Sequence, residues 1–565
     1  MPSPPNDRLT IARALREVSR LLAVRGENPF RARAYERGAR ALEALSGDLG
    51  ERIEGGTLTA TPGIGKALAA EIATLHRTGR SPLLERLRSE LPPGILELMR
   101  VPGLSVGRIA TLHGALGIGS IADLRRACEQ GQVQGVRGFG PATERRILEA
   151  VRTLGESPPR LLLHAAQAEA DPLLDHLRSQ PGVARAEAAG ALRRGCETMD
   201  RVELAAAGEA DAVREAIARW PRTATLGDPG AAGCDAELAS GARVLVHLSS
   251  PADFDAAWHR ATGSPAHVSK VLALPLTRPA PAGEAGIYLA RGLPFIPPEL
   301  REDEGEVEAA LSGTLPDDLL QLHDLRGFVH CHTTYSDGRA TIEQMARAAE
   351  ALGAEYITIT DHSPTASYAG GLGLDRLKAQ WEEIERVQEQ VKVRLLRGTE
   401  SDILADGSLD YPDHVLERME VVIASIHARH RMDARSMTER LTRALRHPLF
   451  KIWGHGLGRL LERRPPVDCD VPAVLDAVSE SRAAVEINGD PHRLDLEPRW
   501  VREARRRGIR FVISTDAHSV GELQNARWGT TVARRGWVRR SEVLNTLPVE
   551  RFRDAVRPGG AGGGP

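Results

Sequence analysis

Two histidines and an aspartate stand close together in residues 328–338, which read FVHCHTTYSDG. In an extended strand alternate side chains share a face, so His330 and His332 are expected to point together while Cys331 points away. Asp337 follows on the polar turn past the strand end, where a loop can return it to the same place. Two imidazoles and a carboxylate so arranged suit a divalent metal that takes nitrogen and oxygen ligands.

The same pattern recurs through the last part of the chain. From about residue 325 to 550, short apolar runs alternate with helical segments, which predicts βα units and a parallel sheet closed into a barrel. Nearly every run ends in an imidazole or a carboxylate, and barrels of this kind place their sites at those ends. The residues concerned are His330, His332, Asp337, Asp361, His362, Glu400, His427, His455, Glu486, Asn488, Asp516 and His518. This supply exceeds what one ion needs and includes no cysteine, so we expect two or three divalent ions, Mn²⁺ first, with Zn²⁺, Fe²⁺ or Mg²⁺ as alternatives.

Three side chains near these ends are expected to support the chemistry. Asp361 and Glu486 are candidates for holding imidazoles in the right tautomer. Arg459 follows His455 closely and is a candidate for binding a phosphate through two hydrogen bonds, with a solvated helix residue as the alternative. Such a cluster activates water near neutral pH and neutralises a phosphoryl group during attack, so the sequence predicts a metal-dependent phosphoesterase.

A second repeated unit lies in the helical region from residue 10 to about 155. It reads TPGIGK, then VPGLSVG, then VRGFGP, and a helical pattern follows each copy. These segments resemble helix-hairpin-helix motifs, whose free backbone N–H groups and helix dipole bind DNA phosphates without reading sequence. A tight turn between helices is the alternative for one copy, but three copies favour DNA binding. The predicted contacts are Gly63, Gly65, Lys66, Gly103, Gly107, Gly138 and Gly140.

The motifs of the last region, HCHTTYSDG, TDHS, GTE, SIH, GHG, EIN and STDAH, resemble in order those of the PHP (polymerase and histidinol phosphatase) superfamily. The resemblance implies a distorted (β/α)7 barrel that holds three metal ions. Gly456 departs from the family's usual proline after the histidine, which alters loop stiffness and removes no ligand. The resemblance places the metal ligands on His330, His332, Asp337, His362, Glu400, His427, His455, Asp516 and His518.

The order of parts resembles bacterial family X DNA polymerases over nearly the whole chain, through NPFRARAYERGARAL, AGALRRGCET, TGSPAH and GLPFIPPELRE. This resemblance implies a multidomain protein whose partner is gapped, nicked or 3′-ended DNA. The barrel is then expected to be a 3′→5′ exonuclease, with abasic sites and 3′-phosphates as further substrates. The implied domains are a helical DNA-binding region at 1–155, an α+β nucleotidyltransferase-like palm and thumb at 160–305, the PHP domain at 320–555 and a disordered tail at 556–565.

The palm departs from the family where its chemistry lies. Family members have Gly-Ser and Arg-Arg, then an Asp-x-Asp pair and a third Asp, and these three carboxylates hold two Mg²⁺ ions. An arginine in place of a ligand carboxylate inverts the local charge and should repel Mg²⁺, so we expect a degenerate palm without polymerase activity. Here the first motif reads Gly190, Ala191, Arg193 and Arg194, and the carboxylate positions fall on Arg201, Glu203 and Leu245.

Other functions remain open on the sequence alone. One is a gap-filling polymerase with unusual ligands such as Asp200 and Glu203, and another is a non-catalytic scaffold that binds DNA ends. A lyase is disfavoured because the family's lysine position falls on Glu71. A phosphatase for small molecules would leave the three phosphate-binding hairpins without a purpose.

Length, charge and cysteine usage set outer limits. With 565 residues the chain is long enough for three or four domains, and its net charge of -2 means that any basic surface for DNA is local. The five cysteines are far apart and form no CxxC pair, which favours a reducing compartment. No stretch is long enough to cross a bilayer and the N-terminus has no leader pattern, so we expect a cytoplasmic monomer without a membrane partner.

Overall fold

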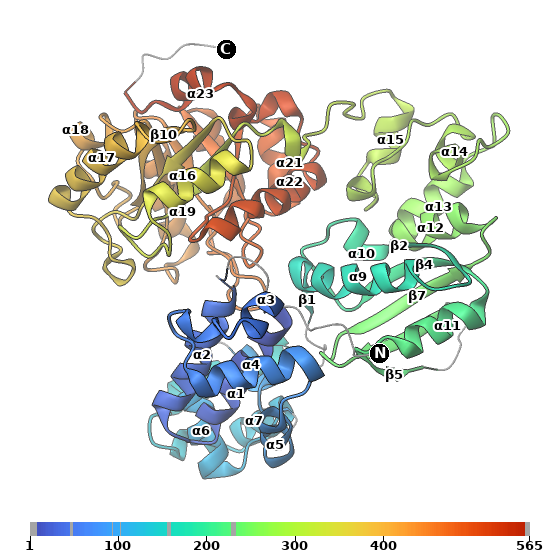
Figure 1. Cartoon of the computed structure of the whole chain (residues 1–565). Helices are drawn as coiled ribbons and strands as arrows, with labels where there is room; N and C mark the ends of the chain where they lie inside the picture. Colours follow the sequence, from blue (N-terminus) through green and yellow to red (C-terminus); the bar gives the residue numbers. More distant parts are fainter. Residues whose placement is uncertain are drawn as a thin grey trace. The chain divides into compact units, whose positions relative to one another are not determined.

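The computed structural model describes residues 8–559 apart from 44, 46–48, 93, 102, 155–159 and 228–232. The chain forms two compact units, Met1–Pro158 and Pro159–Pro565 (Figure 1). Of the tail predicted at 556–565, residues 560–565 lie outside the described residues.

The first unit is helical throughout its described part. Serine side chains begin three of its helices, because Ser81, Ser105 and Ser120 each accept a hydrogen bond from a backbone N–H in the first turn. Two groups of buried aliphatic side chains form its cores. Its elements are α1 (Arg8–Val24), α2 (Pro29–Glu43), α3 (Leu49–Glu54), η1 (Leu58–Ala60), α4 (Lys66–Thr78), α5 (Pro82–Glu90), η2 (Glu97–Arg100), α6 (Val106–Leu116), α7 (Ile121–Glu129), η3 (Val133–Gly135) and α8 (Pro141–Leu154).

The first part of the second unit contains a mixed sheet of five strands in the order β2-β4-β7-β6-β5. Strands β4 and β7 run parallel, with Glu203 opposite Leu245, while the other neighbours are antiparallel. The elements are β1 (Leu161–Leu162), α9 (Leu163–Arg178), β2 (Val183–Ala188), α10 (Gly190–Arg193), β3 (Thr198–Met199), β4 (Val202–Gly208), α11 (Ala210–Arg219), β5 (Thr223–Leu226), β6 (Cys234–Leu238), β7 (Arg243–Ser249) and α12 (Phe254–Thr262).

Short helices with their own small core follow this sheet. Tyr288, Leu293 and Ile296 are buried in that core beside Val271. The elements are α13 (Pro265–Ala273), α14 (Glu284–Leu289), η4 (Pro298–Leu300) and α15 (Glu306–Leu311).

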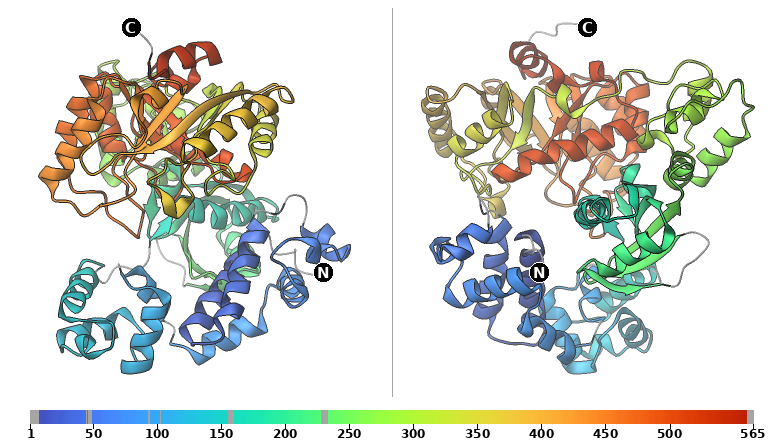
Figure 2. Two further views of the ribbon diagram at one scale, coloured as in Figure 1. Left: turned by 90° about the vertical axis from the view of Figure 1, so that its left-hand side faces the viewer. Right: turned by 45° about the vertical axis from the view of Figure 1, so that its right-hand side comes forward.

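Seven parallel strands form the last sheet, in the order β14-β13-β12-β11-β10-β9-β8. Runs such as VVIAS in β11 are buried along their whole length, as expected for a parallel sheet covered by helices. The helices lie on the outside of the sheet (Figures 1 and 2). The strands are β8 (Gly327–Cys331), β9 (Tyr356–Ile359), β10 (Arg394–Asp402), β11 (Val421–Ser425), β12 (Lys451–Trp453), β13 (Ala483–Asn488) and β14 (Phe511–Ser514).

The connecting elements complete this domain. They are η5 (Leu322–Asp324), α16 (Ile342–Ala351), η6 (Ser367–Ala369), α17 (Leu374–Gln388), α18 (Asp413–Leu416), α19 (Ala434–Leu445), α20 (Val471–Ser479), α21 (Pro498–Arg506), η7 (Val520–Asn525), α22 (Ala526–Arg535), η8 (Arg540–Glu542), η9 (Leu544–Thr546) and α23 (Val549–Val556).

The first and last strands meet, so the sheet is nearly closed. The backbone N–H groups of Thr515 and Ala517 donate to the carbonyls of Val329 and His330, each at 3.1 Å. Phe552 of α23 stacks on Tyr356, with ring centroids 4.7 Å apart, within the apolar core of the barrel. The predicted fold class is therefore confirmed: a helical region, a mixed-sheet domain and a seven-stranded parallel barrel.

Candidate metal centre

The carboxyl ends of the barrel strands bring together all nine side chains that the sequence predicts as metal ligands. They form four overlapping groups, and in each group the possible ligand atoms lie within 4.8 Å of one another. Because several residues belong to two groups, the arrangement suits a few ions close together. The groups are His332 with Asp337, His362 and His518; His330 with His332 and Asp516; His330 with Glu400 and His455; and His362 with Glu400 and His427.

Three of these residues have unusual backbone angles. His330, His455 and Asp516 have φ values of 65°, 26° and 48°, a left-handed region that non-glycine residues seldom occupy. The pairing of β8 is also shifted between Phe328 and Cys331. His330 and His332 therefore converge, with ring centroids 5.2 Å apart, through a bulge and a left-handed residue instead of plain strand alternation. Backbone strain of this kind costs about 1–3 kcal/mol per residue and concentrates at functional sites.

Oxygen acceptors behind the cluster fix the orientation of three imidazoles. His330 Nδ1 lies 2.6 Å from Glu486 Oε1, His427 Nδ1 bonds to Asp402, and His518 Nδ1 bonds to the Asp516 carbonyl. Each contact leaves Nε2 for the centre of the cluster, which is how proteins usually orient metal-binding histidines.

The role of Glu486 agrees with the sequence interpretation, whereas Asp402 was missed. A signal for Asp402 was present in the stretch GTESD. It stands two residues after Glu400 in β10 and so lies on the same face of the strand.

The inner atoms of the cluster fit the demands of divalent metals. His330 Nε2, both nitrogens of His332 and Glu400 Oε2 are buried without a hydrogen-bond partner among the described residues. Polar atoms buried in this state destabilise a protein unless something binds them. Imidazole nitrogens and carboxylate oxygens are the ligands of borderline and hard cations, so this set can hold divalent ions.

The electrostatics keep Glu400 and His332 in the protonation states that metals need. Burial by itself raises the pKa of Glu400, but His427, His330 and His362 hold that pKa well below its ordinary value. Burial together with the neighbouring rings of His518 and His362 lowers the pKa of His332 to about 3. Near neutral pH the carboxylate of Glu400 is ionised and the ring of His332 is neutral. By contrast, and against the effect of burial, the neighbouring carboxylates raise the pKa of His330, of His427 to about 10 and of His518 to about 9, so these three rings would release a proton on binding a metal.

The structure uses Asp361 differently from the expected contact with an imidazole. Its carboxylate accepts hydrogen bonds from Thr333 N at 2.8 Å, Thr333 Oγ1 at 2.6 Å and Ser336 N at 3.1 Å, and from Gln380. No hydrogen bond between Asp361 and an imidazole occurs within the described part of the chain. Asp361 thus fixes the turn that carries Asp337.

Arg459 also differs from the expected phosphate contact. It is buried, donates to the backbone carbonyls of Arg493 and Leu494, and forms an ion pair with Glu197. The guanidinium beside the cluster belongs to Arg493, whose Nε lies 3.2 Å from Asp516 Oδ2 and 3.6 Å from Asp490 Oδ2. Sequence reasoning missed Arg493, although it follows the strand that ends in Asn488.

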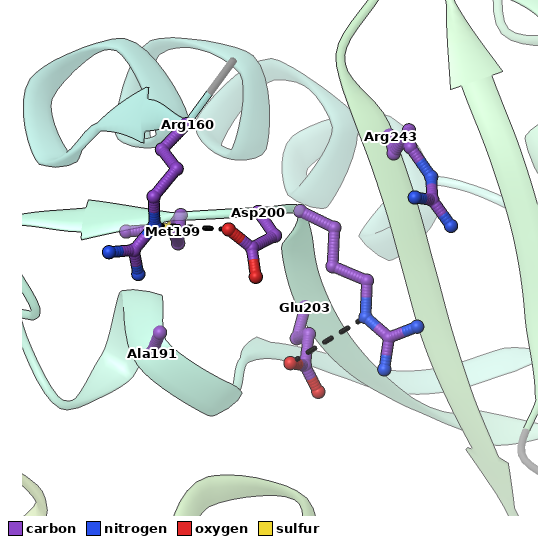
Figure 3. Close-up of a pocket in the computed structure, with 7 residues that line it drawn as sticks. Arg160, Ala191, Met199, Asp200, Glu203 and Arg243 are labelled. Atoms are coloured by element: carbon purple, nitrogen blue, oxygen red, sulfur yellow. Dashed lines mark hydrogen bonds and ion pairs between the residues drawn. The ribbon is translucent and has the colours of Figure 1, made fainter. Parts of the chain in front are cut away.

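The three residues expected at the carboxylate positions of the palm, Arg201, Glu203 and Leu245, lie close together. Arg201 precedes β4, two residues before Glu203 and thus on the same face, and Leu245 of β7 pairs with Glu203. A pocket of about 370 Å³ lies beside them (Figure 3). Its lining residues are Arg160, Ala191, Met199, Asp200, Arg201, Glu203 and Arg243.

The acidic groups of this pocket are already paired with basic ones. Arg160 Nε lies 3.0 Å from Asp200 Oδ1, and Arg201 Nε lies 3.7 Å from Glu203 Oε1 (Figure 3). Glu203 Oε2 also lies 2.9 Å from His247 Nε2. Among the described residues, the groups with metal-ligand geometry all lie in the barrel.

The arginine pair that follows Ala191 also has partners. Arg193 forms an ion pair with Glu284 at 2.6 Å, and Arg194 forms one with Glu302 at 2.9 Å. Gly190, before them, has a φ of 55°, and a Cβ there would lie 2.7 Å from Glu203 Cδ.

The three predicted hairpins of the helical unit share one local structure. In each, a 3₁₀ turn leads to a glycine with positive φ, at 93° for Gly63, 87° for Gly103 and 91° for Gly138, and a helix follows. Helix α4 begins at Lys66, and no side chain caps the backbone N–H groups of its first turn.

The space around the hairpin glycines is open. A Cβ built on Gly65, Gly107 or Gly140 would meet no atom within 4 Å, so a ligand can approach the backbone closely. Arg108 ties the second and third hairpins together by donating to the carbonyls of Gly103 at 2.9 Å and Gly138 at 3.2 Å. DNA binding by these hairpins stays a prediction.

Comparisons with known proteins agree with this division of the chain. A helix-hairpin-helix domain matches residues 6–81, a SAM-like helix-hairpin-helix tandem matches 95–153 and a PHP domain matches 329–463. Two probable phosphatases match a little more than a third of the chain. That of Thermoanaerobacter sp. is 29% identical over 38% of this chain and 89% of its own length, and that of Caldanaerobacter subterraneus is 32% identical over 35% and 79%.

One relative matches over nearly the full length of both proteins. The DNA polymerase/3′-5′ exonuclease PolX of Bacillus subtilis is 34% identical over 561 residues, which are 96% of this chain and 97% of that protein. The chain therefore belongs to the bacterial PolX family, with helix-hairpin-helix domains and a C-terminal PHP domain.

Proposed function

We propose that the barrel is a divalent-metal phosphoesterase that removes nucleotides from the 3′ ends of DNA. The observation that carries this proposal is the group of nine candidate ligands at the strand ends, several of whose buried nitrogen and oxygen atoms have no hydrogen-bond partner among the described residues. The printed activity of the Bacillus subtilis relative supports the choice of DNA 3′ ends, and the probable phosphatases support phosphoester chemistry.

The residues divide the work in a consistent way. When bound, divalent ions supply a nucleophile near neutral pH and offset the charge of the phosphoryl group. Glu486 and Asp402 hold the rings of His330 and His427 in place. Arg493, beside Asp516, is placed to donate hydrogen bonds to a phosphate oxygen. We propose two or three ions and take Mn²⁺ as the first candidate, because the ligand set is nitrogen and oxygen without thiolate.

The helical unit is proposed to hold the DNA through its three hairpins, which would contact backbone phosphates. Gapped, nicked and 3′-ended DNA are the proposed partners, and abasic sites and 3′-phosphates are further substrates. We propose a monomer in the cytoplasm, in keeping with its five free cysteines. In the part of the chain that the structure describes, no helix combines the length and apolar character needed to cross a membrane.

Polymerase activity is proposed to be lost. The palm positions that would hold Mg²⁺ carry Arg201 and Leu245, and the remaining acid, Glu203, is paired with His247. Adding Mg²⁺ there would place it beside a guanidinium, which repels it.

A direct assay tests the nuclease. The purified protein with Mn²⁺ should shorten a 5′-labelled single-stranded oligonucleotide one nucleotide at a time, and His332→Ala should abolish shortening while gel-shift binding of DNA is kept. His323→Ala is the matched control because that histidine is exposed and outside the cluster, and it should retain activity. Shortening that survived His332→Ala would refute the assignment.

A further inference from the structure

An exposed aromatic ring lies at the edge of the metal cluster. Tyr368, in the short element η6 that follows β9, is 70% exposed, whereas most aromatic side chains in the described part are buried or half-buried. Its ring centroid lies 6.3 Å from that of His362 and 6.4 Å from that of His427. These two histidines and Glu400 form one of the four ligand groups. A solvent-exposed aromatic ring therefore lies beside one of the four ligand groups.

The backbone around Tyr368 is firmly held, so its exposure does not result from a loose loop. Ala366 and Ala369 on either side are buried, and the Leu372 N–H donates to the His362 carbonyl at 2.8 Å. Arg376 donates to the Gly370 carbonyl at 2.7 Å. Leaving an aromatic ring in water forgoes the favourable free energy of its burial, so packing does not account for Tyr368.

Charged groups of both signs act on this tyrosine. Glu400, Asp402 and Asp337 act on the Tyr368 hydroxyl more strongly than Arg493 does, and Tyr368 in turn acts on Arg464. Arg464 is held in place by a hydrogen bond of 2.9 Å from its Nε to the Gly458 carbonyl. One exposed ring beside a group of candidate metal ligands matches the two parts of a nucleotide, a flat base and a charged phosphate.

We propose that Tyr368 is the stacking platform for the unpaired base of the 3′-terminal nucleotide. This inference rests on the proposed nuclease function and adds a substrate class to it. With the scissile phosphate at the ligand groups, the terminal base falls about one nucleotide away, beside His362 and His427 where the tyrosine ring lies. Every base has a π-face, so the platform accepts all four bases.

This platform selects single-stranded or frayed ends. A paired terminal base is already stacked on its neighbour within the duplex and has to leave that stack before it contacts Tyr368. The protein is therefore expected to cut single-stranded and mismatched 3′ ends faster than paired ones. A 3′-terminal residue without a base cannot stack on the ring, so its cleavage should not depend on Tyr368.

A cycle of enzyme and substrate changes tests the proposal. The two enzymes are the wild type and Tyr368→Ala, and the two substrates are a single-stranded oligonucleotide and the same strand ending in a base-free tetrahydrofuran residue. Tyr368→Ala should lower kcat/KM about tenfold to a hundredfold on the normal end, the effect expected for the loss of one stacked base. It should have little effect on the base-free end, and Tyr368→Phe should behave as the wild type.

Two controls keep the test decisive. Leu374→Ala removes an exposed apolar side chain from the following helix and should change neither rate. Binding of an oligonucleotide with 2-aminopurine at its 3′ end is also measured by fluorescence in the His332→Ala protein, where cutting is not required. Stacking should quench the fluorescence, and Tyr368→Ala should remove the quenching.

The outcomes are separable. Equal losses on both ends, or no loss of quenching with Tyr368→Ala, would overturn the platform while leaving the nuclease intact. Failure of the wild type to cut either strand would overturn the proposed function, and the fluorescence measurement would still decide whether Tyr368 contacts the terminal base.

Discussion

Arg459 of the barrel and Glu197 of the palm-like domain form an ion pair of 2.6 Å between two parts of the chain. Both side chains are largely buried, and Arg459 also donates to the carbonyls of Arg493 and Leu494. The palm-like domain thereby supports the loop that places Arg493 beside Asp516. This domain thus contributes structure to the candidate metal centre of the barrel.

We predict that this ion pair stabilises the second unit. Glu197→Ala should lower its free energy of unfolding by about 1.5–3 kcal/mol, because it removes a charge-assisted hydrogen bond from the buried guanidinium, which keeps Glu497 at 3.4 Å as its remaining ion-pair partner. Urea unfolding measures the change, and Glu215→Ala, which removes an exposed helix ion pair with Arg219, should change it by less than about 0.5 kcal/mol. An unchanged midpoint for Glu197→Ala would contradict this role.

The shared ligands lead to a prediction about metal content. Glu400 belongs to two ligand groups, whereas Asp337 belongs to one. Glu400→Gln should therefore reduce the number of bound Mn²⁺ ions by more than Asp337→Asn does. Mass spectrometry of metals after dialysis gives the counts, and equal counts for the two variants would argue against a shared carboxylate.

Removing the metal should also lower thermal stability. Ions that bind the folded state alone stabilise it by about 2.7 kcal/mol at a hundred times their Kd. EDTA should therefore lower the Tm of the wild type, and added Mn²⁺ should restore it. The His332→Ala protein should show a smaller difference, and an equal one would place the stabilising ions elsewhere.

Asp402 offers a test of the residues behind the ligands. Its carboxylate bonds to His427 Nδ1, so Asp402→Asn should weaken metal binding about tenfold to a hundredfold while every ligand remains. Titration with Mn²⁺ measures the affinity. Asp406→Asn, an exposed aspartate in the following turn, is the control and should leave affinity unchanged.

Lys451 predicts a pH dependence of stability. Burial, with a smaller contribution from Arg482, lowers its pKa to about 7 in the folded protein. Between that pH and the ordinary lysine pKa the unfolded chain binds the extra proton, so the contribution of Lys451 to stability should rise with pH by up to about 1.4 kcal/mol per unit. Urea unfolding at pH 7, 8 and 9 is compared between the wild type and Lys451→Met, because the raised pKa values of His330, His427 and His518 act in the opposite direction in both metal-free proteins. The stability of the wild type relative to the variant should rise with pH, and a constant difference would contradict this role of Lys451.

The proposed loss of polymerase activity is tested in a variant whose barrel is inactive. His332→Ala prevents shortening from masking synthesis, so this variant is given a primed template, nucleotides and Mg²⁺ or Mn²⁺. We expect no extension, because Arg201 and Leu245 stand where metal ligands are needed. Extension would instead support a polymerase that uses Asp200 and Glu203.

The sequence by itself determined the fold class and the family. Strand ends and their ligands are local patterns, and parallel strands deliver their carboxyl ends to one edge whatever the details of packing. The alternation of apolar runs and helices therefore predicted the barrel. It also predicted that the nine side chains at the strand ends lie close together, although no distance was known. The hairpins were predictable for the same reason, because a glycine with positive φ before a helix is a local requirement.

Only the tertiary structure decided what the charged side chains contact. Arg459 and Arg493 cannot be told apart by their chemistry in the sequence. In the structure Arg459 binds Glu197 and two backbone carbonyls, whereas Arg493 lies beside Asp516. Asp361 likewise bonds to a turn instead of an imidazole, and Tyr368 is exposed beside two histidines from different strands. Such contacts join residues far apart in the chain, so they depend on loop paths and packing that no local pattern encodes.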